Sequence, residues 1–393
     1  MKKRKIILFT GLIRNEELFL EKLIKAANLK SANIIDDVVF STWEGEIQKY
    51  ERVKNFFTEN NFKLIESSQP NLKLQGHVFH QMKTLSYGLD FCGHDCYVYK
   101  MRPDLGSFDN NIADILDGNY NSEVDLSGGW PRLFNERIVI ESALAFHPFY
   151  INDIQFYGEV NDLKKLVNFD LFFEVHYSKL APEQFFYFKN FHDVGNFRHY
   201  FKINQGIHHD DDSKNVVHSS LVFRDPFLMQ LIASYWVILA KYFYFRKTPS
   251  APPKLQDKPT LKDVVAGDVA GLRKLSRKIT TPIINSQFFE KIIGETSDHE
   301  VNLLMEIYRK GCSNYNAINL YSQEKVDSFY ENYKQHFNLN SRKDIHKKNE
   351  NHYIVYGHNL RIQQLDSNDY TEELERQISF MRRKIQELSA SDL

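Results

Sequence analysis

The sequence predicts an α/β protein built on a mostly parallel, doubly wound sheet with helices on both faces. Through the first hundred residues, short apolar runs alternate with longer segments whose apolar residues recur every three or four positions. Parallel strands need such helical crossovers between them. The composition agrees, because 42% hydrophobic and 26% charged residues are typical of a globular chain.

Four strands are expected from the apolar runs, at residues 5–10, 38–42, 62–66 and 96–101. Three helices are expected between them, with the apolar faces Leu20, Leu23, Ile24 and Ala27, then Ile47, Tyr50, Val53 and Phe57, then Val78, Met82, Leu85 and Leu89. Asn15 is placed to cap the first of these helices. Ligands of such sheets bind beyond the carboxyl ends of the strands. We therefore expect residues 11–15, 41–44 and 102–104 around one crevice.

Composition also restricts the class of protein. The net charge of −1 provides no overall attraction to nucleic acid. Three cysteines are too few for a disulfide framework and fit a reducing compartment, so Cys92 and Cys96 are interpreted as buried thiols rather than as a metal site. The apolar start of the chain is too short for a signal peptide and predicts a first strand. We therefore expect a cytoplasmic protein.

The composition divides the chain into four segments. Residues 1–245 carry the α/β pattern, and 246–283 form a basic, proline-rich linker. This linker either contacts an anionic membrane surface or a phosphorylated acceptor, or is a solvated loop. Residues 284–370 are expected to be helical. Within 371–390, apolar residues at spacings of 4, 3, 4 and 3 predict a coiled-coil-like helix, which either docks on the body, self-associates or binds a partner.

Two other segments each allow two interpretations. Residues 227–245 are the most apolar stretch and predict a core helix, with a membrane-facing helix as the alternative. The run 208–212 contains two histidines and three aspartates, but consecutive side chains rarely converge on one ion. We interpret it as an acidic loop.

The most informative stretch is the end of the fourth strand, where Lys100, Arg102 and Asp104 follow a buried run. Arginine and lysine pair with phosphate oxygens, and a carboxylate at a strand end is a ligand for a divalent ion that bridges phosphates. Arg102 stands where a second carboxylate would be expected. Mn or Mg at Asp104 and a metal-independent site are therefore both open, as is an ordinary salt bridge.

Several short motifs, taken in order, resemble the WavE-type lipopolysaccharide synthesis family and some capsular polysaccharide transferases. They lie at residues 40–44, 80–83, 88–89, 97–104, 148–149, 153, 156, 158, 162–163 and 183–184, and cover roughly the first 190 residues. The family usually has a Lys-x-Arg-x-Asp strand end. Pro103 departs from the small or polar residue that is more usual there, and it stiffens the turn that carries Asp104.

The resemblance implies a GT-A-like glycosyltransferase that uses a nucleotide-sugar donor in lipopolysaccharide, O-antigen or capsule synthesis. It would act at the cytoplasmic face of the inner membrane on a lipid-linked or oligosaccharide acceptor. Donor-binding residues are then expected at Arg14, Asn15, Thr42, Trp43, Gln81, Lys100, Arg102 and Asp104.

Transfer with inversion also needs a base near the acceptor hydroxyl. Asp153 is the preferred candidate, because aromatic residues and Gly158 near it are suited to shaping a sugar pocket, and Glu183 is the second. A non-catalytic glycan-binding or nucleotide-sugar-binding scaffold, and the transfer of a phosphate-bearing group, remain as alternatives.

Overall fold

The computed structural model describes residues 3–70, 78–106, 112–117, 120, 122–144, 148–167, 182–195, 197, 226–246, 283–284, 299–318, 324, 328, 354–355 and 358–359. The predicted acidic loop at 208–212 and the predicted helix at 371–390 lie outside these residues. So does nearly all of the predicted linker at 246–283 and much of 284–370.

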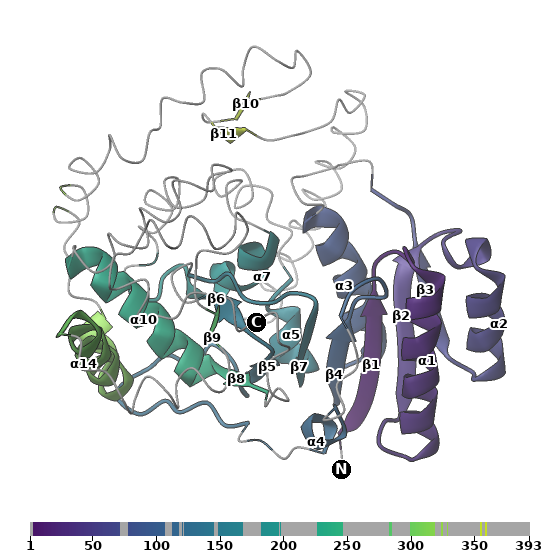
Figure 1. Ribbon diagram of the computed structural model, residues 1–393, viewed down its shortest axis with the longest axis horizontal. Coiled ribbons are helices and arrows are strands. Elements are labelled where there is room, and N and C mark those ends of the chain that lie inside the picture. The colour runs from purple at the N-terminus through teal and green to yellow at the C-terminus, as the bar shows by residue number, and fades with distance from the viewer. Residues whose placement is uncertain are drawn as a thin grey trace, which may run out of the picture.

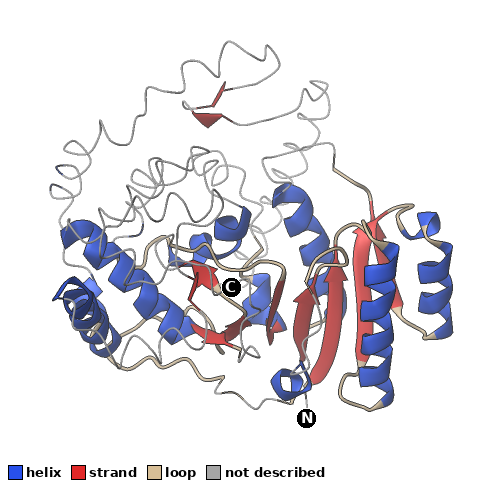
Figure 2. Cartoon of the chain, viewed as in Figure 1, coloured by secondary structure: helices blue, strands red, loops and turns tan. Residues whose placement is uncertain are grey.

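A seven-stranded mixed sheet forms the centre of the molecule, with the strand order β3-β2-β1-β4-β7-β5-β8 (Figure 2). The strands are β1 Arg4–Thr10, β2 Asp37–Trp43, β3 Lys63–Ser67, β4 Cys96–Met101, β5 Ile138–Ile140, β7 Gln155–Glu159 and β8 Phe243–Phe245. All neighbours are parallel except β7, which runs antiparallel to β4 and β5. The mostly parallel α/β sheet is confirmed, and the four predicted strands agree with β1 to β4 to within one residue at each end.

Helices cover both faces of this sheet. One face carries α1 Glu16–Ser31, α2 Glu51–Glu59 and α4 Ile112–Leu116, and the other carries α3 Val78–Cys92, α5 Val160–Lys164, α7 Pro182–Phe191 and α10 Pro226–Tyr242. Successive side chains of a strand point to opposite faces. In β1, Ile6 and Leu8 therefore enter one core, whereas Ile7 and Phe9 enter the other. The five inner strands are likewise apolar on both sides, as expected for a doubly wound sheet.

The first helix shows both a confirmed prediction and a wrong one. The Asn15 side chain accepts a hydrogen bond from the Leu18 backbone N–H at 3.0 Å and caps α1, as predicted. Ile24 was expected in the buried face but is 49% exposed, whereas Lys22 is buried. The buried face is rotated towards Lys22 because the lysine stem packs with the apolar residues while its ammonium group reaches backbone carbonyls of a neighbouring loop.

The most apolar stretch of the sequence combines a helix and a strand. The helix α10 ends at Tyr242, and the next three residues form β8 at the edge of the sheet. Trp236 and Leu239 of α10 are fully buried, so the core-helix interpretation holds for this segment. No helix within the described residues has the length and apolar character needed to cross a membrane.

The remaining elements are peripheral. The helix α14 (His299–Ser313) packs along α10, and the short helix η5 (Tyr315–Ile318) follows it (Figure 1). The indole N–H of Trp130 donates to the Gly311 carbonyl at 3.0 Å and joins the loop before β5 to α14. Short pieces complete the fold, namely η1 Ile47–Lys49, β6 Ala143–Leu144, β9 Ile283–Ile284, β10 Ile354–Val355 and β11 His358–Asn359. Cys92 and Cys96 are buried free thiols, as predicted.

Candidate active site

Three loops meet at the carboxyl ends of β1, β2 and β4. The strand ends are level, because Phe9 of β1 pairs with Phe40 of β2 and with Met101 of β4. The Thr42 hydroxyl donates to the Gly11 carbonyl at 2.8 Å and joins the first two loops. A guanidinium nitrogen of Arg14 lies 3.3 Å from a carboxylate oxygen of Asp104, and this ion pair joins the first loop to the third. The predicted convergence of these loops is therefore present.

The loop that carries Arg14 is fastened to the body of the protein. The backbone N–H of Ile13 donates to the Glu46 carboxylate at 2.8 Å, and the Tyr50 hydroxyl donates to the Ile13 carbonyl. The side chain of Arg14 is nevertheless 62% exposed. The backbone at Arg14 is thus fixed, whereas its guanidinium group is largely open to solvent.

Arg102 and Asp104 form a two-pronged ion pair at the end of β4. Arg102 Nε donates to Asp104 Oδ1 and Arg102 Nη2 donates to Oδ2, both at 2.9 Å. Burial by itself would raise the pKa of Asp104, but the hydrogen bonds and charge of Arg102, together with the charge of Arg14, hold this pKa below its ordinary value. Asp104 is therefore an anion whose two oxygens are both occupied by the same guanidinium group.

These residues do not fit a Mn or Mg ion. Such ions bind through carboxylates, carbonyls and water, and Arg102 takes the position where a second carboxylate would be needed. Among the residues that the structure describes, no group of three or more His, Cys, Asp or Glu side chains is arranged to hold a metal. An ion at Asp104 would also lie beside two guanidinium groups, so we derive no step through a metal.

Lys22, which was not among the predicted site residues, binds the backbone of the turn after β4. Its ammonium group donates to the carbonyls of Arg102 at 2.9 Å, Pro103 at 3.0 Å and Leu105 at 2.7 Å. Burial lowers the pKa of Lys22 to about 8, against the opposing charge of Asp104. Its position among the apolar residues of the predicted helix could have indicated that this lysine is buried.

The two candidate bases lie near the same strand end. Asp153 precedes β7 and is only 4% exposed, whereas Glu183 lies in the first turn of α7 and is half-buried. Burial raises the pKa of Glu183, and the negative charge of Asp153 raises it further, while a hydrogen bond from Tyr150 and the charge of Arg102 oppose the change. The charges of Asp104, Asp153 and Glu183 together raise the pKa of Arg102 against the effect of burial. One guanidinium group thus interacts electrostatically with three carboxylates.

The backbone around Asp153 is fixed by buried donors. Lys100, which is 2% exposed, donates through its ammonium group to the Asp153 carbonyl and, at 3.5 Å, to the Ile154 carbonyl. The Tyr187 hydroxyl donates to the Asn152 carbonyl at 2.9 Å. Burial lowers the pKa of Lys100 to about 8. The structure therefore places Lys100 behind the Asp153 loop rather than in the crevice where donor contact was expected.

A second set of polar contacts supports this loop from the far edge of the sheet. The Glu141 carboxylate accepts from Asn152 at 2.8 Å and from Gln155 at 3.0 Å, and its other oxygen pairs with Arg246 at 3.1 Å. Arg246 also donates to the Tyr99 hydroxyl at 3.0 Å. These partners come from separate parts of the sequence, so no local pattern marks them as a group.

The other predicted donor-binding residues are largely engaged in contacts within the protein. The amide of Asn15 caps α1, and the hydroxyl of Thr42 is buried against the first loop. Trp43 is buried, and its ring packs edge-on against His80 with 5.5 Å between centroids. Gln81 lies half-buried on α3. Three of these four residues therefore make contacts that shape the site.

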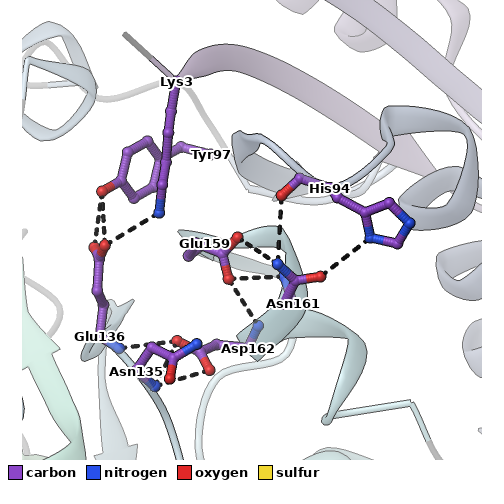
Figure 3. A network of polar contacts seen from close by, with 8 residues as sticks. All are labelled: Lys3, His94, Tyr97, Asn135, Glu136, Glu159, Asn161 and Asp162. Carbon is purple, nitrogen blue, oxygen red and sulfur yellow. Dashed lines mark hydrogen bonds and ion pairs between the residues drawn. The ribbon is translucent and has the colours of Figure 1, made fainter. Parts of the chain in front are cut away.

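A polar network lies where β4 begins, at the end of this strand opposite to Arg102 and Asp104 (Figure 3). The buried carboxylate of Asp162 accepts from the backbone N–H groups of Asn135 and Glu136 at 2.9 Å each. Glu136 in turn accepts from the Tyr97 hydroxyl at 2.8 and 2.9 Å. The side chain of Glu159 caps α5, and its backbone lies opposite Tyr97 where β7 pairs with the start of β4. The network fastens the loop before β5 to α5.

Comparison with known proteins places the chain in no family. No protein-family model matches the sequence, and a search of curated proteins found no match.

Proposed function

We propose that the chain is a glycosyltransferase that moves a sugar from a nucleotide-sugar donor to a glycan acceptor of a bacterial surface polysaccharide. The observation that carries this proposal is the Arg102–Asp104 pair at the end of β4, with Arg14 on one side and Asp153 and Glu183 close by. Two guanidinium groups suit the phosphates of a donor, and a carboxylate with a raised pKa suits a base. A cytoplasmic location, with contact to the inner membrane, belongs to the same proposal.

The topology supports a GT-A-like catalytic domain. A ligand crevice is expected where parallel strands end, and the described loops meet there at β1, β2 and β4. The antiparallel β7 between β4 and β5 brings Asp153, which precedes β7, to the end at which β4 finishes. One reversed strand in the sheet thus gives the crevice both cations and carboxylates.

In the proposed reaction, the acceptor hydroxyl oxygen attacks the anomeric carbon of the donor while the bond from that carbon to the phosphate oxygen breaks. The nucleotide leaves with the bonding electrons, and Arg14 and Arg102 stabilise the charge that develops on its phosphate. A carboxylate accepts the proton of the acceptor hydroxyl. Inversion at the anomeric carbon follows if this base and the leaving group lie on opposite faces of the sugar.

We assign the base to Glu183 and a supporting role to Asp153. Glu183 is the more accessible of the two, and its raised pKa brings it closer to neutral pH, where a general base is most effective. The charge of Asp153 contributes to that raised pKa. The sequence favoured Asp153 as the base because of the aromatic residues near it in the chain. Such neighbours do not determine which carboxylate an acceptor can reach, so we reverse that preference.

The first experiment is a thermal-shift screen of the purified protein against UDP-, GDP-, dTDP- and CMP-sugars, since a ligand of the native state raises its apparent stability. For the donor that binds, turnover is then measured by product mass. Glu183→Gln should keep donor binding and lower kcat by about 100-fold or more, whereas the control Glu59→Gln, at an exposed site on α2, should leave both unchanged. The absence of a shift with every donor would contradict the proposal and favour a scaffold.

The pH dependence tests the division of roles. The rate should fall as pH drops through the pKa of Glu183, because the base must be ionised. Asp153→Asn removes a negative charge that raises this pKa, so the acidic limb of the kcat profile should move to lower pH. An unmoved limb, or loss of the limb altogether, would return the base role to Asp153.

A further inference from the structure

We propose that nucleotide binding at this crevice requires no divalent cation, because Arg102 and Arg14 supply the positive charge that a metal ion would otherwise provide. The inference rests on the proposed function and specifies how the donor phosphates are held. The ligand class is a nucleotide monophosphate or diphosphate, free or linked to a sugar.

The first argument is the state of Asp104. Both of its oxygens accept hydrogen bonds from Arg102 at 2.9 Å, in the forked geometry that makes this kind of pair strong. A divalent ion would have to displace this guanidinium group from a carboxylate that is almost buried. Asp104 is therefore better described as the residue that orients Arg102 than as a metal ligand.

The second argument is the charge around Arg102. Asp153 and Glu183 also act electrostatically on the Arg102 guanidinium, so this cation serves two carboxylates besides Asp104. Arg102 thus brings a positive charge to the end of β4, where Asp104 holds it by two hydrogen bonds. Its covalent attachment and its contact with Asp104 fix it there before any ligand arrives, and this preorganisation favours anion binding.

The third argument is the contrast between the two arginines. Arg102 is largely buried and held by two hydrogen bonds, whereas Arg14 is 62% exposed and is held to Asp104 by one contact of 3.3 Å. Turning Arg14 from Asp104 to a phosphate costs little, because Asp104 keeps Arg102 as its partner. We infer that Arg102 is the fixed phosphate contact and Arg14 the adjustable one.

The test is calorimetric titration of the full chain with UDP, GDP, dTDP, CDP and CMP, each in EDTA and in Mn²⁺. The nucleotide that binds should do so in EDTA with a Kd close to that in Mn²⁺. Arg14→Ala should weaken this binding by about 10- to 100-fold, which is the usual effect of losing one charge-assisted contact. The exposed position of Arg14 makes this a variant that keeps the fold.

Arg52→Ala is the matched control. Arg52 is 61% exposed and is also paired with a carboxylate, that of Glu17, but it lies on α2. This variant should bind as the wild type does. Binding that appears only with Mn²⁺, or an Arg14→Ala protein that binds normally, would overturn the inference and leave the transferase proposal standing. If no nucleotide binds in either buffer, both proposals fail.

Discussion

Replacing Lys100 by methionine removes an ammonium group that is buried behind the Asp153 loop. Burial lowers the pKa of this lysine from 10.5 to about 8 in the folded chain. Between these two values the unfolded chain holds a proton that the folded chain has lost, so the free energy of unfolding must rise with pH. One pKa unit corresponds to about 1.4 kcal/mol, and the complete effect of Lys100 is therefore about 3 kcal/mol.

Lys22 has the same direction of shift and the same approximate pKa, so two buried lysines contribute to the wild-type rise. Lys100→Met should remove about half of this rise in the free energy of unfolding with pH. At pH 7 the variant no longer buries a charge, but it leaves the Asp153 and Ile154 carbonyls without this donor, at about 1–3 kcal/mol each. These effects oppose one another, so stability at pH 7 should stay within about 2 kcal/mol of the wild type.

The assay is urea unfolding at half-unit steps from pH 7 to pH 9, where tyrosines, with an ordinary pKa of about 10, are still largely protonated. Lys25→Met, on the exposed side of α1, is the control and should keep the full rise. An identical pH slope in Lys100→Met and the wild type would refute the reasoning. Turnover adds a functional readout, because a displaced Asp153 loop should lower kcat more than it changes KM for the donor.

Two further predictions concern the frame around the site. Asp162→Asn should lower the free energy of unfolding by about 3–5 kcal/mol, because a buried anion that satisfies several donors is lost. Asp117→Asn, at an exposed ion pair, should change it by less than about 1 kcal/mol, and equal effects in urea titrations would contradict this. Gly88→Ala should lower the melting temperature, because its Cβ would lie 2.6 Å from Leu8 Cδ1. Overpacking of about 1–3 kcal/mol outweighs a helix-propensity gain of about 1 kcal/mol, and a higher melting temperature would show that Leu8 yields freely.

The first half of the sheet was predictable because its signals are local. The strands β1 to β4 are short apolar runs between amphipathic helices, and the parallel order then follows from the crossovers. The same reasoning brought Arg14, Arg102 and Asp104 to one crevice, since residues that follow parallel strands share one edge of the sheet. Their ion pairs agree with that expectation.

The rest depended on contacts between distant residues. In the run 227–245, hydrophobicity is continuous, so it does not mark Tyr242 as the end of a helix or the next residue as the start of β8. The place of Lys22 in the core depends on carbonyls that lie eighty or more residues away in the chain. Likewise, nothing near Glu141 in the chain indicates that Arg246 is its partner.

The position of β8 at the end of the sheet has a consequence for biosynthesis. The strands β1 to β4 and the turn of Asp104 are complete once the first 106 residues have been made. The contacts that support the Asp153 loop, in contrast, are complete only when Arg246, the partner of Glu141, has left the ribosome. Domains fold as the nascent chain emerges, N-terminal parts first. We therefore expect the strand ends that carry Arg14, Arg102 and Asp104 to form early in translation, and the support of the Asp153 loop to be completed last.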